Sequence, residues 1–196
     1  MGALCWRFPL FRVVPLQAAQ AQQGAAFDAE VFAREFWETK LLPAAAQATE
    51  LNDLLAALAK DPMAARQRYG RSLGLSSTTA IFVQGAGRVS AIEDDFIRVA
   101  LSGTPPGGEV LLSTGLVFGN AVRDGTGLLD VSAYADSQDF NKLSTALNGI
   151  VETKVSPALR EQAKVGREIR FAGCLELEED AAFDGLQIVP VKVEWP

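Results

Sequence analysis

Charged and amide side chains gather in one stretch of the chain, residues 115–130, that has no regular hydrophobic period. Asn120, Arg123 and Asp124 stand there among turn-forming glycines. Irregular backbone with such groups is where a fold commonly contacts another molecule. The alternative is a long surface loop whose ion pair contributes little to stability. The residues alone favour this second interpretation.

A second candidate is the polar face of the helix predicted over residues 136–159. Asn141, Thr145, Asn148 and Glu152 recur at helical spacing, opposite an apolar stripe. These side chains are suited to line a polar groove. A solvated helix face is the commoner origin of such a pattern, and we prefer that interpretation.

Acid–base chemistry is the third candidate, because four carboxylates cluster near the end of a predicted strand. They are Glu176, Glu178, Glu179 and Asp180. Carboxylates can serve as general acids and bases. No nucleophile or metal-binding partner accompanies them in the sequence. We therefore interpret the cluster as a solvated acidic run.

Several kinds of chemistry are excluded by composition. The chain has no histidine, which rules out catalysis of the Ser-His-Asp and Cys-His types. Its two cysteines, Cys5 and Cys174, cannot form a zinc site without further soft ligands. A disulfide between them is disfavoured, because Cys174 falls inside a predicted strand. We predict no metal, no cofactor and no enzymatic activity.

The charge balance bears on partners. The net charge is −6 and the sequence pI is about 4.8. Proteins that bind nucleic acid usually carry a basic patch, and polybasic segments mark binding to anionic membrane surfaces. Most aromatic residues after residue 79 fall on predicted apolar faces. We therefore predict no nucleic-acid partner.

The order of elements after residue 79 predicts a barrel. Three segments of alternating polarity precede the predicted helix, and two follow it. This is the order of a small Greek-key barrel of the OB type. Gly85 and Gly87 interrupt the alternation of the first strand and mark a bulge or a sharp coil, where this long strand must bend to join both sheets of a small barrel. Pro190 marks an edge or a bulge in the last strand. We predict an α+β protein in which an N-terminal helical segment, 27–72, packs on an OB-like barrel domain, 79–196.

The central helix of the barrel domain has recognisable ends. Asp136 or Ser137 is expected to cap its start. Phe140, Leu143 and Leu147 are expected to form its buried stripe. Pro157 is expected to kink or end it, because proline interrupts helical hydrogen bonding.

Helix-start signals divide the N-terminal helical segment. Asp28 is expected to cap a first helix, with Phe27 and Phe32 as a hydrophobic staple. Thr49 is expected to cap a second helix, and Asp61 to begin a third.

Residues 1–26 allow two interpretations. Their apolar run is interrupted by Arg7 and Arg12 and is too short and too charged to span a bilayer. The segment is either an ordinary N-terminus that docks on the domain, or an export-signal remnant or membrane anchor followed by a linker. In the second case Trp6 and Phe8 would lie at the membrane–water interface.

A series of short motifs resembles, in its order, the DUF2291 family of predicted periplasmic lipoproteins. The motifs include Phe36-Trp37-Glu38, Tyr69-Gly70, Gly119-Asn120-Ala121-Val122-Arg123-Asp124, Ala146-Leu147-Asn148 and Ile188-x-Pro190-Val191. The resemblance implies export to the envelope of a bacterium, N-terminal anchoring and a genetic association with sugar ABC transporters. A recognisable lipidation motif is missing around Cys5.

These observations lead to one expectation and two alternatives. We expect a non-catalytic periplasmic protein that binds a small molecule, such as a sugar, or an envelope protein partner. Its ligand-binding residues would be Arg123, Asp124, Asn120 and Asn148, with Arg123 on a ligand carboxylate or hydroxyl and Asp124 accepting from a sugar hydroxyl. The alternatives are a structural or protein-interaction module without a ligand, and a carboxylate-dependent hydrolase.

Overall fold

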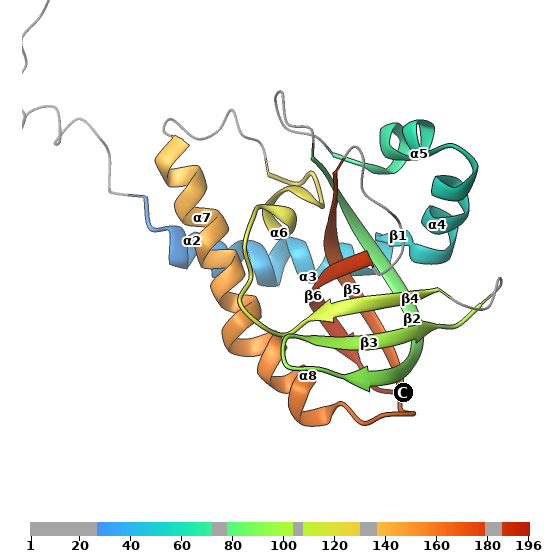
Figure 1. Cartoon of the computed structure of the whole chain (residues 1–196). Helices are drawn as coiled ribbons and strands as arrows, with labels where there is room; N and C mark the ends of the chain where they lie inside the picture. Colours follow the sequence, from blue (N-terminus) through green and yellow to red (C-terminus); the bar gives the residue numbers. More distant parts are fainter. Residues whose placement is uncertain (1–26, 72–77, 104–107, 130–136, 179–185) are drawn as a thin grey trace, which may run out of the picture.

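A closed β-barrel dominates the computed structural model, which describes residues 27–71, 78–103, 108–129, 137–178 and 186–196. Its strands are β2 (Thr79–Ile92), β3 (Phe96–Leu101), β4 (Glu109–Ser113), β5 (Glu168–Leu177) and β6 (Leu186–Glu194). Within the described residues they pair in the order β2-β3-β4-β6-β5, and β5 pairs back with β2 (Figure 1). Only β4 and β6 run parallel in this ring. The predicted Greek-key barrel is present, and it is closed.

Closure depends on strand β2, which pairs on both sides. It pairs with β5 from Thr79 to Arg88 and with β3 from Gly87 onward. As predicted, one long first strand runs through both glycines and joins both sides of the barrel, changing partner near Gly87; its register shifts later, between Val89 and Ala91. Gly87 is needed for close approach, since a Cβ there would lie 2.3 Å from the carbonyl oxygen of Ala100.

The last strand contains the predicted irregularity. Pro190 pairs with Gly173 where the register between β5 and β6 shifts. Because β6 lies between β4 and β5, it is not an edge strand. The proline therefore marks a bulge, as proline within a sheet commonly does.

Two apolar cores lie inside and outside the barrel wall. The interior core joins alternate strand residues to Leu51, Leu54 and Leu58 of α4 (Leu51–Lys60) and to Leu159 of α8 (Ser156–Gln162). Figure 1 shows α4 and α8 on opposite sides of the barrel. The N-terminal helical segment thus shares a core with the barrel. The predicted boundary between them falls in residues 72–77, outside the described residues.

The outer core packs helices on the barrel wall. Helix α2 (Ala29–Phe36) and helix α7 (Ser137–Ile150) cover outward-facing residues of β5 and β6, including Cys174 and Val191. Leu143 and Leu147 of the predicted stripe are fully buried there. This core fixes α7 against the barrel, and α7 positions the candidate site.

Two prolines follow π-helical turns, and neither ends its run of helical residues. Pro157 does not end the central helix, because a π-helical turn, η4 (Val151–Val155), leads into α8, which continues to Gln162. Pro43 likewise follows a π-helical turn, η1 (Trp37–Leu41), and opens α3 (Leu42–Ala44) and the short 3-10 helix η2 (Ala45–Gln47). The wider turn accommodates a residue that lacks an N–H and clashes with the preceding turn.

The capping predictions have mixed outcomes. Asp28 accepts hydrogen bonds from the N–H groups of Glu30 and Val31, and the Phe27 and Phe32 rings lie 5.7 Å apart, as predicted. Asp61 caps α5 (Pro62–Tyr69). The expected Thr49 cap is wrong, because Thr49 belongs to β1 (Thr49–Glu50), which pairs in parallel with β2. Asp136 lies outside the described residues.

Candidate functional site

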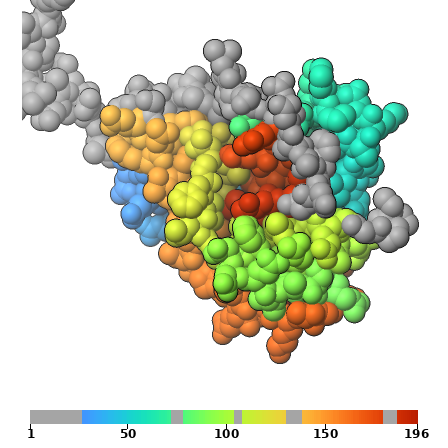
Figure 2. Space-filling view, in the orientation of Figure 1, coloured from blue at the N-terminus to red at the C-terminus, as the bar shows by residue number. Residues whose placement is uncertain are grey.

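The segment expected to be a loop contains a short helix. Helix α6 (Ala121–Asp124) lies between α7 and the barrel, with Ala121 and Val122 in the outer core. Figure 2 shows the yellow surface of this segment between light-orange α7 and the green and red strands. Arg123 is only 6% exposed. The interpretation of Arg123 and Asp124 as a surface ion pair is therefore wrong.

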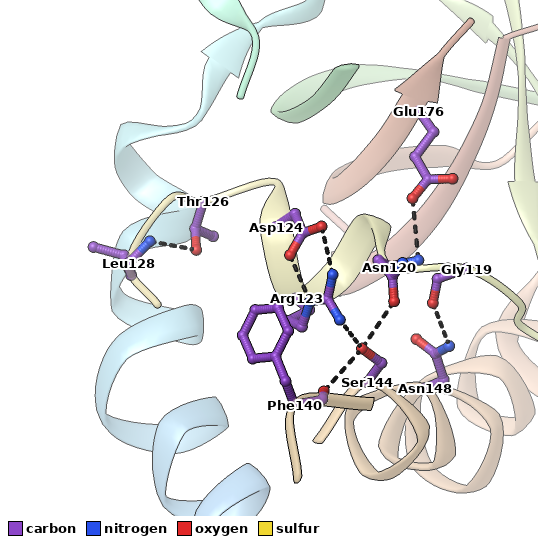
Figure 3. Close-up of polar contacts among 10 residues, drawn as sticks. All are labelled: Gly119, Asn120, Arg123, Asp124, Thr126, Leu128, Phe140, Ser144, Asn148 and Glu176. Carbon is purple, nitrogen blue, oxygen red and sulfur yellow. Dashed lines mark hydrogen bonds and ion pairs between the residues drawn. The ribbon is translucent and has the colours of Figure 1, made fainter. Parts of the chain in front are cut away.

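Arg123 is held on three sides. Its Nε donates to Asp124 Oδ1 over 2.6 Å, and its Nη2 donates to Asp124 Oδ2 over 2.9 Å. Its Nη1 donates to Ser144 Oγ over 2.9 Å. The guanidinium carbon lies 3.8 Å from the centre of the Phe140 ring (Figure 3). Bidentate geometry and aromatic stacking favour arginine over lysine here.

Ser144 links the ion pair to the segment before α6. Its hydroxyl accepts from Arg123 and donates to Asn120 Oδ1 over 2.9 Å. A contact to the Phe140 carbonyl is longer, at 3.4 Å, so the single hydroxyl proton is directed mainly to Asn120. We did not predict Ser144. The sequence feature that could have identified Ser144 is its position four residues from both Phe140 and Asn148, which places all three on one helix face.

Side chains of the central helix hold the backbone of residues 117–119. Asn148 Nδ2 donates to the carbonyls of Val117 and Gly119, over 3.3 and 3.1 Å. Glu152 Oε1 accepts from the Val117 N–H over 2.8 Å. The solvated-face interpretation is wrong for Asn148 and Glu152, which bind this backbone. It is right for Asn141 and Thr145, which are exposed.

Glu176 holds the same segment from the barrel. Its Oε1 accepts from the Asn120 N–H over 3.1 Å. Gly119 has a φ of +81°, which favours glycine, and a Cβ there would lie 3.1 Å from Glu176 Oε2. Glu176 and Glu178 are exposed, as a solvated run would be, but Glu176 also has this structural contact. Glu179 and Asp180 lie outside the described residues.

Three of the four predicted site residues line one cleft of about 190 Å³, which we call the charged cleft. Its walls are formed by Arg71, Thr78, Ala80, Gly119, Asn120, Arg123, Asp124 and Glu176. Asn148 instead lines a neighbouring groove, which also includes Asn120. Arg71 was missed because it lies at the end of the helical segment predicted over 27–72, far in sequence from the other candidate residues. Two backbone hydrogen bonds with Ala80 fix its position beside β2.

The charged cleft suits polar ligands better than metals. It combines two guanidinium groups with two carboxylates, so donors and acceptors lie side by side. Across the described ranges, no cluster of three or more His, Cys, Asp or Glu side chains could hold a metal ion.

The sequence of this chain matches a known protein family. The model of the DUF2291 family, described as predicted periplasmic lipoprotein, matches residues 2–194. This chain belongs to the DUF2291 family. The family description confirms the predicted envelope localisation.

The fold of this DUF2291 chain is also found in a solved structure. A crystal structure of an OB-fold protein from Thermotoga maritima superposes with a TM-score of 0.75. It is 27% identical in sequence, and the match covers 88% of this chain and 100% of that one. The predicted fold class is thereby confirmed. No curated protein matches this chain. In the part of the chain that the structure describes, no helix is both long and apolar enough to cross a membrane.

Cys174 lies in the DUF2291 barrel wall close to the charged cleft. Its thiol is free and fully buried. Burial, followed by the nearby charges of Glu176 and Asp124, raises its pKa well above that of an ordinary thiol. The thiol is thus kept protonated and inert, which makes Cys174 a core residue. Cys5 lies outside the described residues.

Proposed function

We propose that this DUF2291 chain is a non-catalytic envelope protein that binds a small polyhydroxylated molecule, such as a sugar, in the charged cleft. The observation that supports this most directly is the composition of the cleft. Arg71, Asn120 and Glu176 line a space of about 190 Å³ and supply both donors and acceptors. A sugar hydroxyl both donates and accepts hydrogen bonds, so it can use both kinds of group at once.

The contacts divide the cleft into supporting and accessible groups. Arg123 donates three hydrogen bonds to Asp124 and Ser144, and the Phe140 ring covers one face of its guanidinium group. We therefore assign Arg123 and Asp124 mainly to holding the cleft in shape. Glu176 uses one oxygen for Asn120, which leaves Oε2 as an acceptor for the ligand.

Arg71 supplies the matching donor. It is exposed and lines the cleft, and its Nε lies 2.9 Å from the position that a Cβ on Gly127 would take. Its five N–H groups suit a ligand with several hydroxyls or a carboxylate. Arg71 and Glu176 thus replace Arg123 and Asp124 as the residues that we assign to ligand contact.

The proposal includes an accessory role in sugar uptake by an ABC transporter. This role follows from what the family resemblance implies, an association with genes for such transporters. A protein held at the envelope with a rigid polar cleft can bind a sugar without any chemical step.

Isothermal titration of the full chain with neutral monosaccharides and sugar acids tests the proposal. We expect at least one of them to bind. Glu176→Gln and Arg71→Met should each weaken that binding by about tenfold to hundredfold, the range for losing a hydrogen bond to a charged group. Glu178→Gln is the matched control, since Glu178 lies two residues away and outside the cleft.

Two outcomes would contradict the proposal. One is the absence of binding to every sugar tested, with a folded protein verified by circular dichroism. The other is binding that Glu176→Gln and Arg71→Met leave unchanged, because the ligand would then bind elsewhere.

A further inference from the structure

Phe118 is held in an exposed position beside the charged cleft. Its side chain is 80% exposed, although burying an aromatic side chain is normally favourable. Val117 before it is buried, and its N–H and carbonyl are bound by Glu152 and Asn148. Gly119 after it is bound by the same Asn148 amide. The backbone on both sides of Phe118 is therefore fixed by the central helix, which fixes the position from which the exposed ring projects.

The ring lines a groove of about 390 Å³, which we call the Phe118 groove. Its walls are formed by Val117, Phe118, Gly119, Asn120, Asn141, Ser144, Thr145, Asn148 and Glu152. Amides and hydroxyls predominate among its polar groups, and Glu152 is its one ionisable side chain. The charged cleft, by contrast, has two arginines and two carboxylates.

The groove retains unused hydrogen-bonding atoms near the ring. Asn148 donates through its side-chain amide nitrogen to the carbonyls of Val117 and Gly119, which leaves its side-chain oxygen as an acceptor. Glu152 spends one oxygen on Val117, which leaves the other. Asn120 accepts from Ser144 through its oxygen, which leaves its amide nitrogen as a donor. An aromatic surface flanked by amide groups and one carboxylate oxygen matches a ring with one apolar face and hydroxyls at its edge.

The two cavities share a wall. Gly119 and Asn120 line both of them, and Figure 3 shows Asn120 between Ser144 on one side and Glu176 on the other. The Phe118 groove therefore lies directly beside a ligand in the charged cleft, across the wall formed by Gly119 and Asn120. Asn120 can contact both parts of such a ligand.

We propose that the Phe118 groove is a second subsite, which binds an uncharged polyhydroxylated ring against Phe118 while the first ring occupies the charged cleft. The ligand class is then a two-ring saccharide rather than a single sugar. This inference rests on the proposed function, since it extends the ligand of the charged cleft.

Titration of the full chain with matched pairs of sugars tests the subsite. Suitable pairs are glucose and maltose, galactose and lactose, and xylose and xylobiose. For the pair that binds, we expect the two-ring sugar to bind about tenfold more tightly, in line with one aromatic contact and its flanking hydrogen bonds. Phe118→Ala should remove this gain and leave the affinity for the single ring unchanged, whereas Phe118→Trp should retain it.

Leu116→Ala is the matched control for Phe118→Ala. Leu116 is 73% exposed, two residues before Phe118, and does not line the groove. It should not change either affinity. Because both positions are exposed, the variants should fold, and their melting temperatures verify this.

The outcomes separate this inference from the proposed function. A single ring that binds with no gain from the second ring, or a gain that survives Phe118→Ala, overturns the subsite and leaves the charged cleft in place. Failure of single-ring and two-ring sugars alike overturns both. A gain that is lost in Phe118→Ala and retained in Leu116→Ala supports the subsite.

Discussion

Removal of the Asp124 carboxylate should destabilise the protein far more than removal of a carboxylate from an exposed ion pair. In the Asp124→Ala variant, the guanidinium of Arg123 loses two hydrogen bonds, of 2.6 and 2.9 Å. The Arg123 side chain is only 7% exposed, so water cannot fully replace the carboxylate. Loss of one partner from a buried ion pair costs about 3–5 kcal/mol.

Thermal and urea unfolding of the full chain measure this cost. For a domain of this size, the expected loss corresponds to a fall in melting temperature of about 6–20 °C. The matched control is Glu93→Ala. Glu93 pairs with Arg98 over 2.8 Å, with side chains 44% and 38% exposed, and exposed pairs contribute about 0.2–1 kcal/mol.

A double variant tests whether the unpaired charge of Arg123 causes the loss of stability in Asp124→Ala. Arg123→Met with Asp124→Ala removes both charges and keeps an apolar side chain against Phe140. It should recover most of the loss, because replacing a buried ion pair by apolar groups is often nearly neutral. The reasoning is refuted if Asp124→Ala costs no more than Glu93→Ala, or if the double variant is less stable than Asp124→Ala.

Three further predictions concern the glycine of the site, the buried thiol and the helix caps. Gly119→Ala should lower the free energy of unfolding by about 1–2 kcal/mol, because φ is +81° there. The variant should also weaken sugar binding in the isothermal titration. Unchanged stability and unchanged sugar binding would contradict the assigned geometry. In a Cys5→Ser background, Cys174 should react with a thiol reagent only after unfolding. Because its pKa is raised in the folded state, the contribution of Cys174 to stability should be constant below the ordinary thiol pKa and fall as the pH rises above it. Urea titrations from about pH 7 to 10 measure this, and a stability that does not fall toward the upper end of that range would oppose the assignment. Asp28→Ala should cost about 0.5–2 kcal/mol by thermal unfolding, whereas Thr49→Ala should cost less than about 0.5 kcal/mol, and a reversal of this order would argue against the observed caps.

Much of the fold could be predicted because it depends on local patterns. Alternation located the barrel strands, helical spacing located the Phe140–Leu147 stripe, and Asp28 and Asp61 marked two helix starts. Thr49 was misassigned because its partner, Val83, lies far along the chain. A capping signal is local, whereas parallel pairing with β2 is decided by the tertiary fold.

The site was predictable in its location but not in its contacts. The turn-forming residues and the charged pair pointed to residues 115–130, and the helix α6 was found there. Burial of Arg123 depends on Ser144, 21 residues later, and the position of Asn120 depends on Glu176, 56 residues later. No sequence period relates residues at these separations. Glu176 therefore appeared to be one member of an acidic run.

The attachment of residues 117–120 to the rest of the fold has a consequence for affinity. Asn148, Glu152 and Glu176 fix this backbone before any ligand arrives. Ordering a free backbone costs roughly 1–2 kcal/mol per residue, and a loop that orders on binding subtracts that cost from its affinity. In this protein the backbone of residues 117–120 is already ordered by folding, so ligand binding does not carry that cost. Even a weakly interacting neutral ligand can therefore retain most of the free energy of its contacts, and its binding should involve little conformational change in this wall.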